Sequence, residues 1–157
     1  MSAKTYQQLV QEALTHVPEW QPWDLAAALT QATPPLVLDI REPQEFAAAH
    51  IPGAVNVPRG LLEQSAEWGF DETEPELVCA RDRLVITVCR SGNRSALAAR
   101  TLQLMGFRDV RSLKTGLRGW NDFEQPLVNA AGEVVDADAA DALFTARVRP
   151  DQMPPGH

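Results

Sequence analysis

Two short apolar runs constrain the fold of this chain more than any other feature. Residues 84–88 read LVITV, and residues 36–40 read LVLDI, which is apolar apart from Asp39. Short apolar runs of this kind are typical of strands that are buried on both faces, as they are in parallel sheets. We therefore expect both runs to be strands of a parallel sheet, with 84–88 as a central strand.

Strands and helices alternate along the middle of the chain. Two further strands are expected at 54–57 and 109–113. Helices are expected at 43–49, 60–68, 95–107 and 117–123. This alternation predicts an α/β fold in which a mainly parallel central sheet of about five strands is flanked by helices.

The two ends of the chain differ from this alternating middle. Apolar residues share one face of a helix at 5–17, and Asp24 is placed to cap a second helix. From about Gln125 the pattern weakens, with one more helix expected at 136–146 and a disordered tail at 149–157. We predict an N-terminal helical extension, a central domain and a partly disordered C-terminal extension, at residues 1–22, 23–124 and 125–157.

Composition argues against several functional classes. The net charge is −7 over 157 residues, whereas nucleic acid binding needs a concentrated basic surface. No stretch resembles a membrane span, and the N-terminus lacks the apolar core of a secretory signal, so we expect a cytoplasmic protein without a membrane partner. The two cysteines and three histidines show no ligand spacing. We therefore expect neither a metal nor a cofactor.

One cysteine stands in a loop suited to anion chemistry. Cys89 directly follows the expected central strand, and a helix begins about five residues later. Ligands of open α/β sheets bind in such a strand-to-helix crevice. Gly92 permits a tight loop, in which backbone N–H groups and the positive end of the helix dipole can converge on one point. We expect this loop to stabilise a Cys89 thiolate, a nucleophile that then needs no histidine base.

Two questions about the loop stay open. Cys89 could be a buried packing residue, but packing requires neither a glycine-bearing loop nor two flanking arginines. Ser91 and Ser95 carry weaker signals. Ser95 could donate a hydrogen bond to the sulfur or cap the following helix, and we expect the cap.

Four motifs together resemble the single-domain rhodanese family of sulfurtransferases. In chain order they are LDIREPQEF (38–46), HIPGAVNVP (50–58), VCRSGNRSALAA (88–99) and LKTGLRGW (113–120). The resemblance covers about Asp24 to Phe123 and implies a rhodanese-like fold. It also implies that Cys89 takes sulfane sulfur from thiosulfate or a similar donor as a persulfide. Cyanide, a thiol or a sulfur-acceptor protein would then accept that sulfur.

The length of the loop separates two chemistries within this resemblance. Sulfurtransferases of the family use six residues from the cysteine to the arginine, and their phosphatase relatives use seven. The six residues here are Cys89, Arg90, Ser91, Gly92, Asn93 and Arg94. Val88 also stands where protein tyrosine phosphatases typically have histidine. Sulfur transfer is therefore favoured over a phosphatase-like activity. A protein-docked persulfide relay and a non-catalytic interaction module are two further functions that the sequence allows.

Three arginines are candidates for holding an anionic donor. Arg90 and Arg94 lie in the loop, and a guanidinium group binds oxyanions through two hydrogen bonds. For Arg94 a second role is equally expected, which is to pair with a carboxylate and brace the loop. Arg59 follows the second motif, and it either reaches the mouth of the pocket or lies on a solvated surface.

Further motif residues are expected to support the site. Asp39 and Arg41 end the first strand at the sheet edge that Cys89 occupies, and the resemblance implies that they brace the active-site region; a cap or turn contact is equally expected for Asp39. His50 is expected to make a structural hydrogen bond, and Trp120 is expected in the core. Thr115 stands where the family pattern has a glycine, beside the expected site, and this difference is expected to alter donor preference.

The second cysteine is expected to lie far from the first. Cys89 comes ten positions after Cys79, and at least five of the residues between them form the central strand. A strand advances about 3.3 Å per residue, whereas the Cα atoms of a disulfide lie within roughly 7 Å of each other. We therefore expect Cys79 to be a loop or packing residue and not a partner of Cys89.

Overall fold

The computed structural model describes residues 2–156, so Met1 and His157, which belong to the two predicted extensions, lie outside the described residues. Within that range, five strands form one sheet in the order β1-β5-β4-β2-β3, and all neighbours run parallel. The strands are β1 (Glu19–Trp20), β2 (Leu36–Asp39), β3 (Val55–Asn56), β4 (Leu84–Val88) and β5 (Asp109–Leu113). The predicted α/β fold with a parallel sheet is confirmed, and β4 is its central strand.

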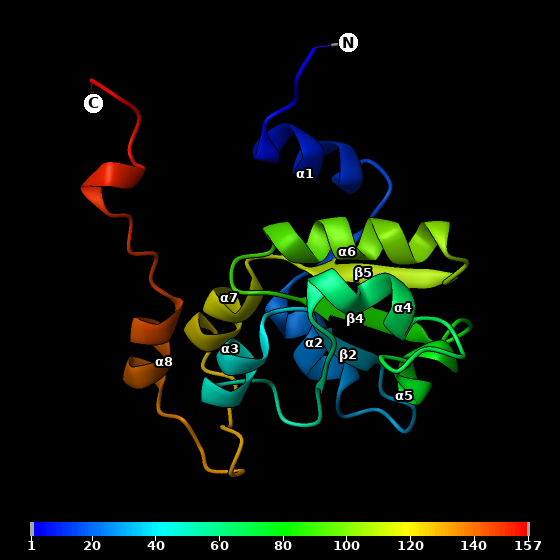
Figure 1. The fold of residues 1–157 in the computed structure, drawn as a ribbon. Helices are drawn as coiled ribbons and strands as arrows, with labels where there is room; N and C mark the ends of the chain where they lie inside the picture. Colours follow the sequence, from blue (N-terminus) through cyan, green and yellow to red (C-terminus); the bar gives the residue numbers. More distant parts are fainter. Residues whose placement is uncertain (1, 157) are drawn as a thin grey trace.

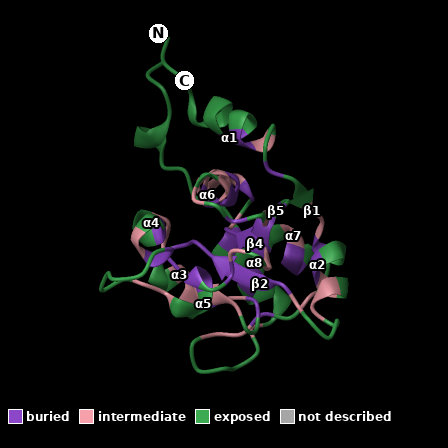
Figure 2. Cartoon of the chain, turned by 90° about the vertical axis from the view of Figure 1, so that its right-hand side faces the viewer, coloured by how far each residue is buried: buried purple, intermediate pink, exposed green. Residues whose placement is uncertain are grey.

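The strands β2 and β4 form the buried centre of the sheet. They pair from Leu36 with Val85 to Asp39 with Val88, and the N–H group of Ile40 donates to the carbonyl of Val88 at 3.0 Å. Both strands are buried along nearly their whole length, and Figure 2 shows them between two layers of helices. Burial on both faces explains why their sequences are almost wholly apolar.

One face of the sheet is covered by α4 (Leu62–Ser65), α5 (Pro75–Val78) and α6 (Asn93–Leu104). Here Leu38 and Val85 of the sheet pack in one cluster with Leu102 of α6. The helix α1 (Tyr6–Leu14) lies on the outer side of α6, where its Val10 and Ala13 form a separate cluster with Ala96 (Figure 1). A short 3₁₀ turn, η1 (Arg59–Leu61), leads into α4.

The opposite face is covered by α2 (Pro22–Ala28), α7 (Gly116–Asp122) and α8 (Ala137–Phe144). Val37 of β2 and Ile86 of β4 are paired neighbours that face this side, and they pack in one cluster with Trp120 and Phe144. The predicted core position of Trp120 is confirmed, because its side chain is 1% exposed. The helix α3 (Pro43–Ala48) follows β2, and a 3₁₀ turn, η2 (Pro150–Gln152), lies near the C-terminus.

Several element boundaries differ from the predictions. The segment 60–68 forms only η1 and the single turn of α4, and α6 begins two residues earlier than expected. The helix α2 begins at Pro22, so Asp24 is not its cap. Its carboxylate lies in the first turn and accepts a hydrogen bond from the N–H group of Gln21 at 2.9 Å. The partial disorder expected for the C-terminal extension stays a prediction.

Candidate active site

The sulfur of Cys89 receives two backbone N–H groups. Cys89 follows β4 directly and is 1% exposed. The N–H group of Gly92 donates to Sγ at 3.1 Å, and that of Ser95 donates at 3.4 Å. Both donors belong to the loop and first turn that open α6, where the positive end of the helix dipole also lies. The predicted convergence of backbone donors on the sulfur is therefore present in the structure.

The hydroxyl of Ser95 also contacts the sulfur. Its Oγ lies 3.4 Å from Cys89 Sγ and 2.8 Å from Oγ of Ser112 on β5. The expected helix cap is wrong, because Gly92 is the N-cap residue of α6 and Ser95 is its third helical residue. Ser95 is fully buried, so its hydroxyl connects the sulfur to the sheet instead of ending a helix.

The tight turn of the loop requires a glycine at position 92. Gly92 has φ 97°, in the left-handed region that favours glycine. A Cβ atom there would also lie 3.2 Å from the backbone nitrogen of Thr115 and 3.3 Å from the carbonyl oxygen of Leu113. The loop is thus packed closely against the segment that joins β5 to α7.

The N-terminus of α7 holds the outer side of the loop. The N–H group of Leu117 donates to the carbonyl of Cys89 at 2.9 Å, and that of Arg118 donates to the carbonyl of Arg90 at 3.0 Å. Gly116 makes this approach possible, since a Cβ atom at that position would lie 2.5 Å from the Cys89 carbonyl oxygen. With its carbonyls bound to α7, the loop keeps N–H groups directed at the sulfur.

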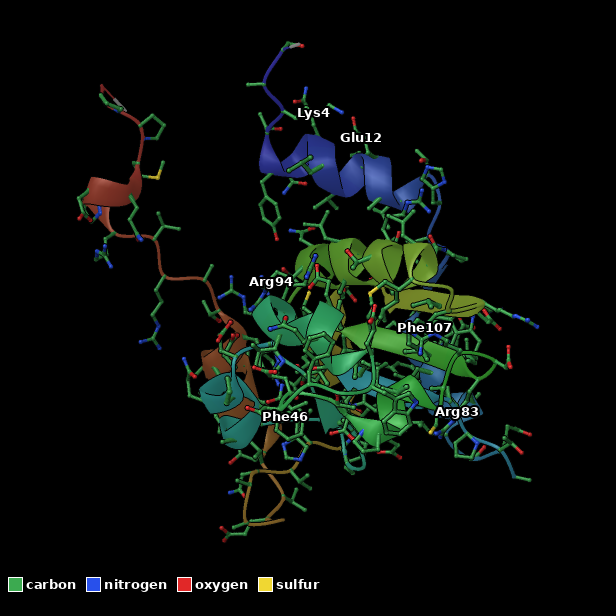
Figure 3. All side chains as sticks on the ribbon, turned by 45° about the vertical axis from the view of Figure 1, so that its right-hand side comes forward. Lys4, Glu12, Phe46, Arg83, Arg94 and Phe107 are labelled. Atoms are coloured by element: carbon green, nitrogen blue, oxygen red, sulfur yellow. The ribbon has the colours of Figure 1, made fainter. Side chains whose placement is uncertain are left out.

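Arg94 pairs with a carboxylate, which was one of its two predicted roles. Its guanidinium donates to both oxygens of Glu45 on α3, at 3.0 and 3.1 Å. Burial alone would raise the pKa of Glu45, but the hydrogen bonds and charge of Arg94 outweigh it and hold that pKa below the ordinary carboxyl value. The bond to Glu45 in turn raises the pKa of Arg94. Figure 3 shows Arg94 at the end of α6 that faces the start of α1.

Arg90 is the other guanidinium of the loop. It is half-buried, and it forms no ion pair within residues 2–156. Ser91 is exposed and Asn93 is half-buried, and neither side chain makes a hydrogen bond within the same range. Of the two loop arginines, Arg90 is therefore the one whose charge is not already matched by a carboxylate of the described chain.

Arg59 does not approach the sulfur. Its guanidinium donates to Glu63 at 3.1 Å and to Oγ1 of Thr101 at 3.1 Å. Thr101 lies eight residues after Asn93, which is about 12 Å along α6. The structure therefore places Arg59 beside the second half of that helix, away from the cysteine loop.

Asp39 and Arg41 form a buried ion pair beside the site. The guanidinium of Arg41 donates to Asp39 at 2.8 Å and to the carbonyl of Ala49 at 2.6 Å. The amide of Asn56 donates to the carbonyls of both residues at 3.0 Å. Asp39 is not a helix cap, but its Oδ1 accepts a hydrogen bond from the N–H group of Arg41 at 3.1 Å, so the predicted turn contact is present. The pair fixes the chain that leaves β2 next to the end of β4, where Cys89 follows Val88.

The remaining candidates have structural contacts. The Nδ1 atom of His50 lies 2.7 Å from the carbonyl of Phe46, and the two rings are stacked. Cys79 is exposed at the end of α5 and, like Cys89, is a free cysteine. Within residues 2–156, no group of three His, Cys, Asp or Glu side chains is arranged to hold a metal ion.

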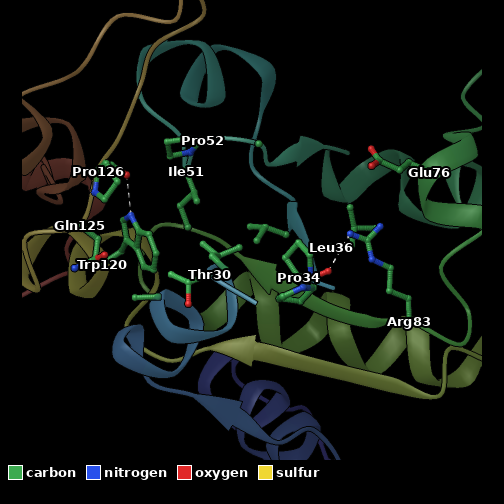
Figure 4. A pocket seen from close by; sticks show the side chains of 15 residues that line it. Thr30, Pro34, Leu36, Ile51, Pro52, Glu76, Arg83, Trp120, Gln125 and Pro126 are labelled. Carbon is green, nitrogen blue, oxygen red and sulfur yellow. Dashed lines mark hydrogen bonds between the residues drawn. The ribbon is translucent and has the colours of Figure 1, made fainter. Parts of the chain in front are cut away.

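A cavity of about 480 Å³ lies at the other end of the central strands, where they begin (Figure 4). Leu36 and Arg83 line it where β2 and β4 begin, and Ile51 and Trp120 add apolar walls. The guanidinium of Arg83 donates to the carbonyl of Pro34 at 3.1 Å. None of the residues of the cysteine loop lines this cavity, so it is separate from the candidate site.

Three contacts of the loop were not predicted from the sequence. Glu45 belongs to the first of the four motifs, but its pairing with Arg94 spans 49 residues and has no local pattern. Thr87 and Ser112 are buried, and each contacts Ser95 through its hydroxyl, at 2.9 and 2.8 Å. A polar residue at a buried strand position was the available signal for both.

Comparison with known proteins identifies the family. The family model for the rhodanese-like domain matches residues 22–123. The chain belongs to the rhodanese-like family. Among curated relatives, the thiosulfate sulfurtransferase GlpE of Tolumonas auensis is 34% identical over 95 residues, which are 60% of this chain and 80% of that protein. The predicted resemblance to rhodaneses is therefore confirmed, and the family comprises sulfurtransferases and sulfur carriers.

Two other similar proteins differ in how they are described. A protein of Bacillus subtilis described only provisionally as a sulfur carrier, YrkF, is 37% identical over 84 residues, which are 54% of this chain and 40% of YrkF. This chain thus corresponds to less than half of that relative. A solved structure from Rhodopseudomonas palustris, described as of unknown function and a possible tyrosine phosphatase, is 28% identical, has a TM-score of 0.71, and overlaps 80% of this chain and 96% of that one.

Membrane insertion has no support from the helices. None of those within residues 2–156 has both the length and the apolar character needed to cross a bilayer.

Proposed function

We propose that this rhodanese-like protein is an enzyme that transfers sulfane sulfur through a persulfide on Cys89. The observation that carries the proposal is the convergence of the Gly92 and Ser95 N–H groups and the Ser95 hydroxyl on Cys89 Sγ. Such donors stabilise a thiolate at Sγ, which is the attacking group when sulfur is loaded and the leaving group when sulfur is unloaded. The same geometry therefore serves both steps of a two-step reaction.

In the loading step, the thiolate of Cys89 attacks the outer sulfur of thiosulfate. A bond forms between Sγ and that sulfur, and the sulfur–sulfur bond of thiosulfate breaks. The electron pair of the broken bond leaves with sulfite, and Cys89 retains one extra sulfur atom as a persulfide anion. No proton has to be removed by a base if the cysteine is already a thiolate, so the site requires no histidine.

In the unloading step, an acceptor nucleophile attacks the outer sulfur of the persulfide. Cyanide would give thiocyanate, and a thiolate would give a new persulfide. The bond between this sulfur and Cys89 breaks, and its electron pair returns to Sγ as the thiolate. The two half-reactions make the mechanism ping-pong.

Arg90 is the residue that we assign to the anionic donor. Arg94 is already bound through both nitrogens to Glu45, whereas Arg90 has no carboxylate partner in the described chain. A guanidinium near the mouth of the loop would attract a dianion and stabilise the departing sulfite. Arg94 would instead brace the loop, and Asp39 with Arg41 would brace the adjoining end of β2.

A protein-docked persulfide relay is the second candidate function. The similarity to YrkF supports it. A phosphatase-like activity has less support, since the loop has six residues and Val88 precedes the cysteine. For either sulfur-transfer function, we propose a cytoplasmic location and sulfur donors and acceptors as partners.

Steady-state formation of thiocyanate from thiosulfate and cyanide tests the enzyme against the relay. We expect turnover by the wild type, none by Cys89→Ser, and a loss of roughly tenfold or more in Ser95→Ala, which removes a hydrogen bond to a charged sulfur. Ser91→Ala is the matched control, because the exposed Ser91 has no contact with Sγ, and it should retain full activity. Thiosulfate turnover too slow to detect, together with loading from a protein persulfide, would favour the relay. Hydrolysis of p-nitrophenyl phosphate without sulfur transfer would contradict both.

A further inference from the structure

The N-terminal helix α1 runs along α6 in the same direction, as Figure 1 shows. At the far ends of the two helices, the amide of Gln103 donates to the carbonyl of His16 at 2.9 Å. Nearer their starts, Val10 and Ala13 of α1 form a buried cluster with Ala96 of α6. These two contacts fix the register of the helices.

This register brings the first turn of α1 to the cysteine loop. Tyr6 precedes Val10 by four residues, so it lies on the same helix face about 6 Å closer to the N-terminus. Four residues before Ala96, at the start of α6, is Gly92, whose N–H group donates to Cys89 Sγ. Tyr6 is therefore level with the loop that holds the sulfur.

The first turn of α1 is an ordered element. Thr5 is its N-cap residue and forms a capping box with Gln8, with hydrogen bonds of 2.9 and 3.1 Å. A capping box satisfies two backbone N–H groups that a helix start would otherwise leave unpaired. Tyr6 is the first helical residue after this cap, so its backbone position is fixed both by the cap and by the packing of Val10.

The electrostatic surroundings of Tyr6 agree with this placement. Partial burial raises the pKa of Tyr6, and its electrostatic interaction with Cys89 acts in the same direction, while Arg94 and Arg90 act in the opposite direction. The phenol thus interacts electrostatically with the sulfur and with both loop arginines, and it is protonated at neutral pH. Its side chain is 49% exposed, and no hydrogen bond within residues 2–156 involves its hydroxyl. A neutral O–H donor is therefore available beside an anion-binding loop.

We propose that Tyr6 is a specificity-determining residue of the sulfur-transfer site, whose hydroxyl donates a hydrogen bond to the oxygens of an oxyanionic sulfur donor. This proposal rests on the sulfur-transfer function proposed above. It assigns the N-terminal helix, which lies outside the 22–123 range of the family match, to the wall of the active site. A donor whose transferred sulfur is not attached to an oxyanion cannot make this contact.

The variant Tyr6→Phe tests the proposal, because it removes the hydroxyl and keeps the ring. In single-turnover experiments, we expect the second-order rate constant for loading Cys89 from thiosulfate to fall about tenfold. This is the effect of losing one hydrogen bond to a charged acceptor. Loading from glutathione persulfide, whose transferred sulfur is not bonded to an oxyanion, should change by less than about twofold. The Tm of the variant should match that of the wild type, since the ring is retained.

Gln7→Ala is the matched control. Gln7 follows Tyr6 in α1 and lines a groove with Lys4 and Gln11, so its loss should leave both donors unaffected. An unchanged rate with thiosulfate in Tyr6→Phe, or an equal loss with both donors, would overturn the assignment of Tyr6. If the wild type loads from neither donor, the proposed sulfur-transfer function fails as well, and this result is distinct from a defect confined to the variant.

Discussion

Thr115 is a residue whose backbone conformation does not suit its side chain. It has φ 65°, in the left-handed region, where β-branched residues are rare. It is the N-cap residue of α7 and precedes Gly116, which lies against the Cys89 carbonyl. The family pattern has a glycine at position 115, and the backbone retains the conformation that a glycine adopts without strain.

Replacing Thr115 by glycine should stabilise the protein. The left-handed conformation costs about 1–2 kcal/mol for a residue with a Cβ atom, and glycine gives the unfolded chain about 0.4–1 kcal/mol of added freedom. We therefore expect Thr115→Gly to raise the free energy of unfolding by roughly 0.5–1 kcal/mol in urea titrations. Thr145→Gly is the control, because Thr145 has φ −81° and carries no such strain, so it should not stabilise. A loss of stability in Thr115→Gly would contradict this account.

At the scale of elements, the ion pair between Arg94 and Glu45 connects α6 to α3 across 49 residues. Both side chains are about one third exposed. The pKa of Glu45 is held below its ordinary value of 4.5, because the hydrogen bonds and charge of Arg94 outweigh the effect of burial. A lowered carboxyl pKa contributes stability that is fully present above the ordinary value and is lost as the pH falls through the lower folded-state value.

The variant Glu45→Gln should therefore be less stable than the wild type only when the carboxylate is ionised. At pH 7 we expect a loss of roughly 0.5–1 kcal/mol, which suits a partly exposed pair. As the pH falls below 4.5, the two unfolding curves should converge. Glu72→Gln is the control, because Glu72 is exposed and forms no ion pair within residues 2–156. A difference between wild type and Glu45→Gln that is constant from pH 7 to acid would refute the role of the pair.

Elements with a strong local pattern could be predicted from sequence. The runs 36–40 and 84–88 bury both faces, and this property alone predicts the parallel sheet. The strand β1 could not be found, because two residues that include the polar Glu19 carry no periodicity; pairing with Ser112 and Leu113 makes them a strand.

The same distinction applies to the candidate site. The position of Cys89 and the turn at Gly92 follow from local sequence. Local sequence does not decide whether Arg94 binds a donor or pairs with a carboxylate, or whether Ser95 contacts the sulfur or caps the helix. These contacts depend on Glu45 and Ser112, which only the folded chain brings near. Tyr6 was missed for the same reason, since its place beside the loop is set by the packing of α1 on α6.

At the scale of the whole molecule, the two ends of the parallel strands differ in chemistry. The carboxyl ends of β2 and β4 hold the Asp39–Arg41 pair and Cys89, with α6 and α7 meeting at the cysteine loop. The amino ends border the separate cavity near Arg83. Nucleophile, backbone donors and arginines are thus collected at one edge, as expected for a parallel α/β sheet.

The measurement that tests the account most directly is the intact mass of the protein after incubation with thiosulfate. We predict a gain of one sulfur atom, about 32 Da, which cyanide or a thiol removes and which Cys89→Ser does not show; covalent catalysis through Cys89 requires this intermediate. The free Cys79 is an internal control, because Cys79→Ser should gain the same mass as the wild type. If no sulfane-sulfur donor adds this mass to Cys89, the sulfurtransferase account is contradicted.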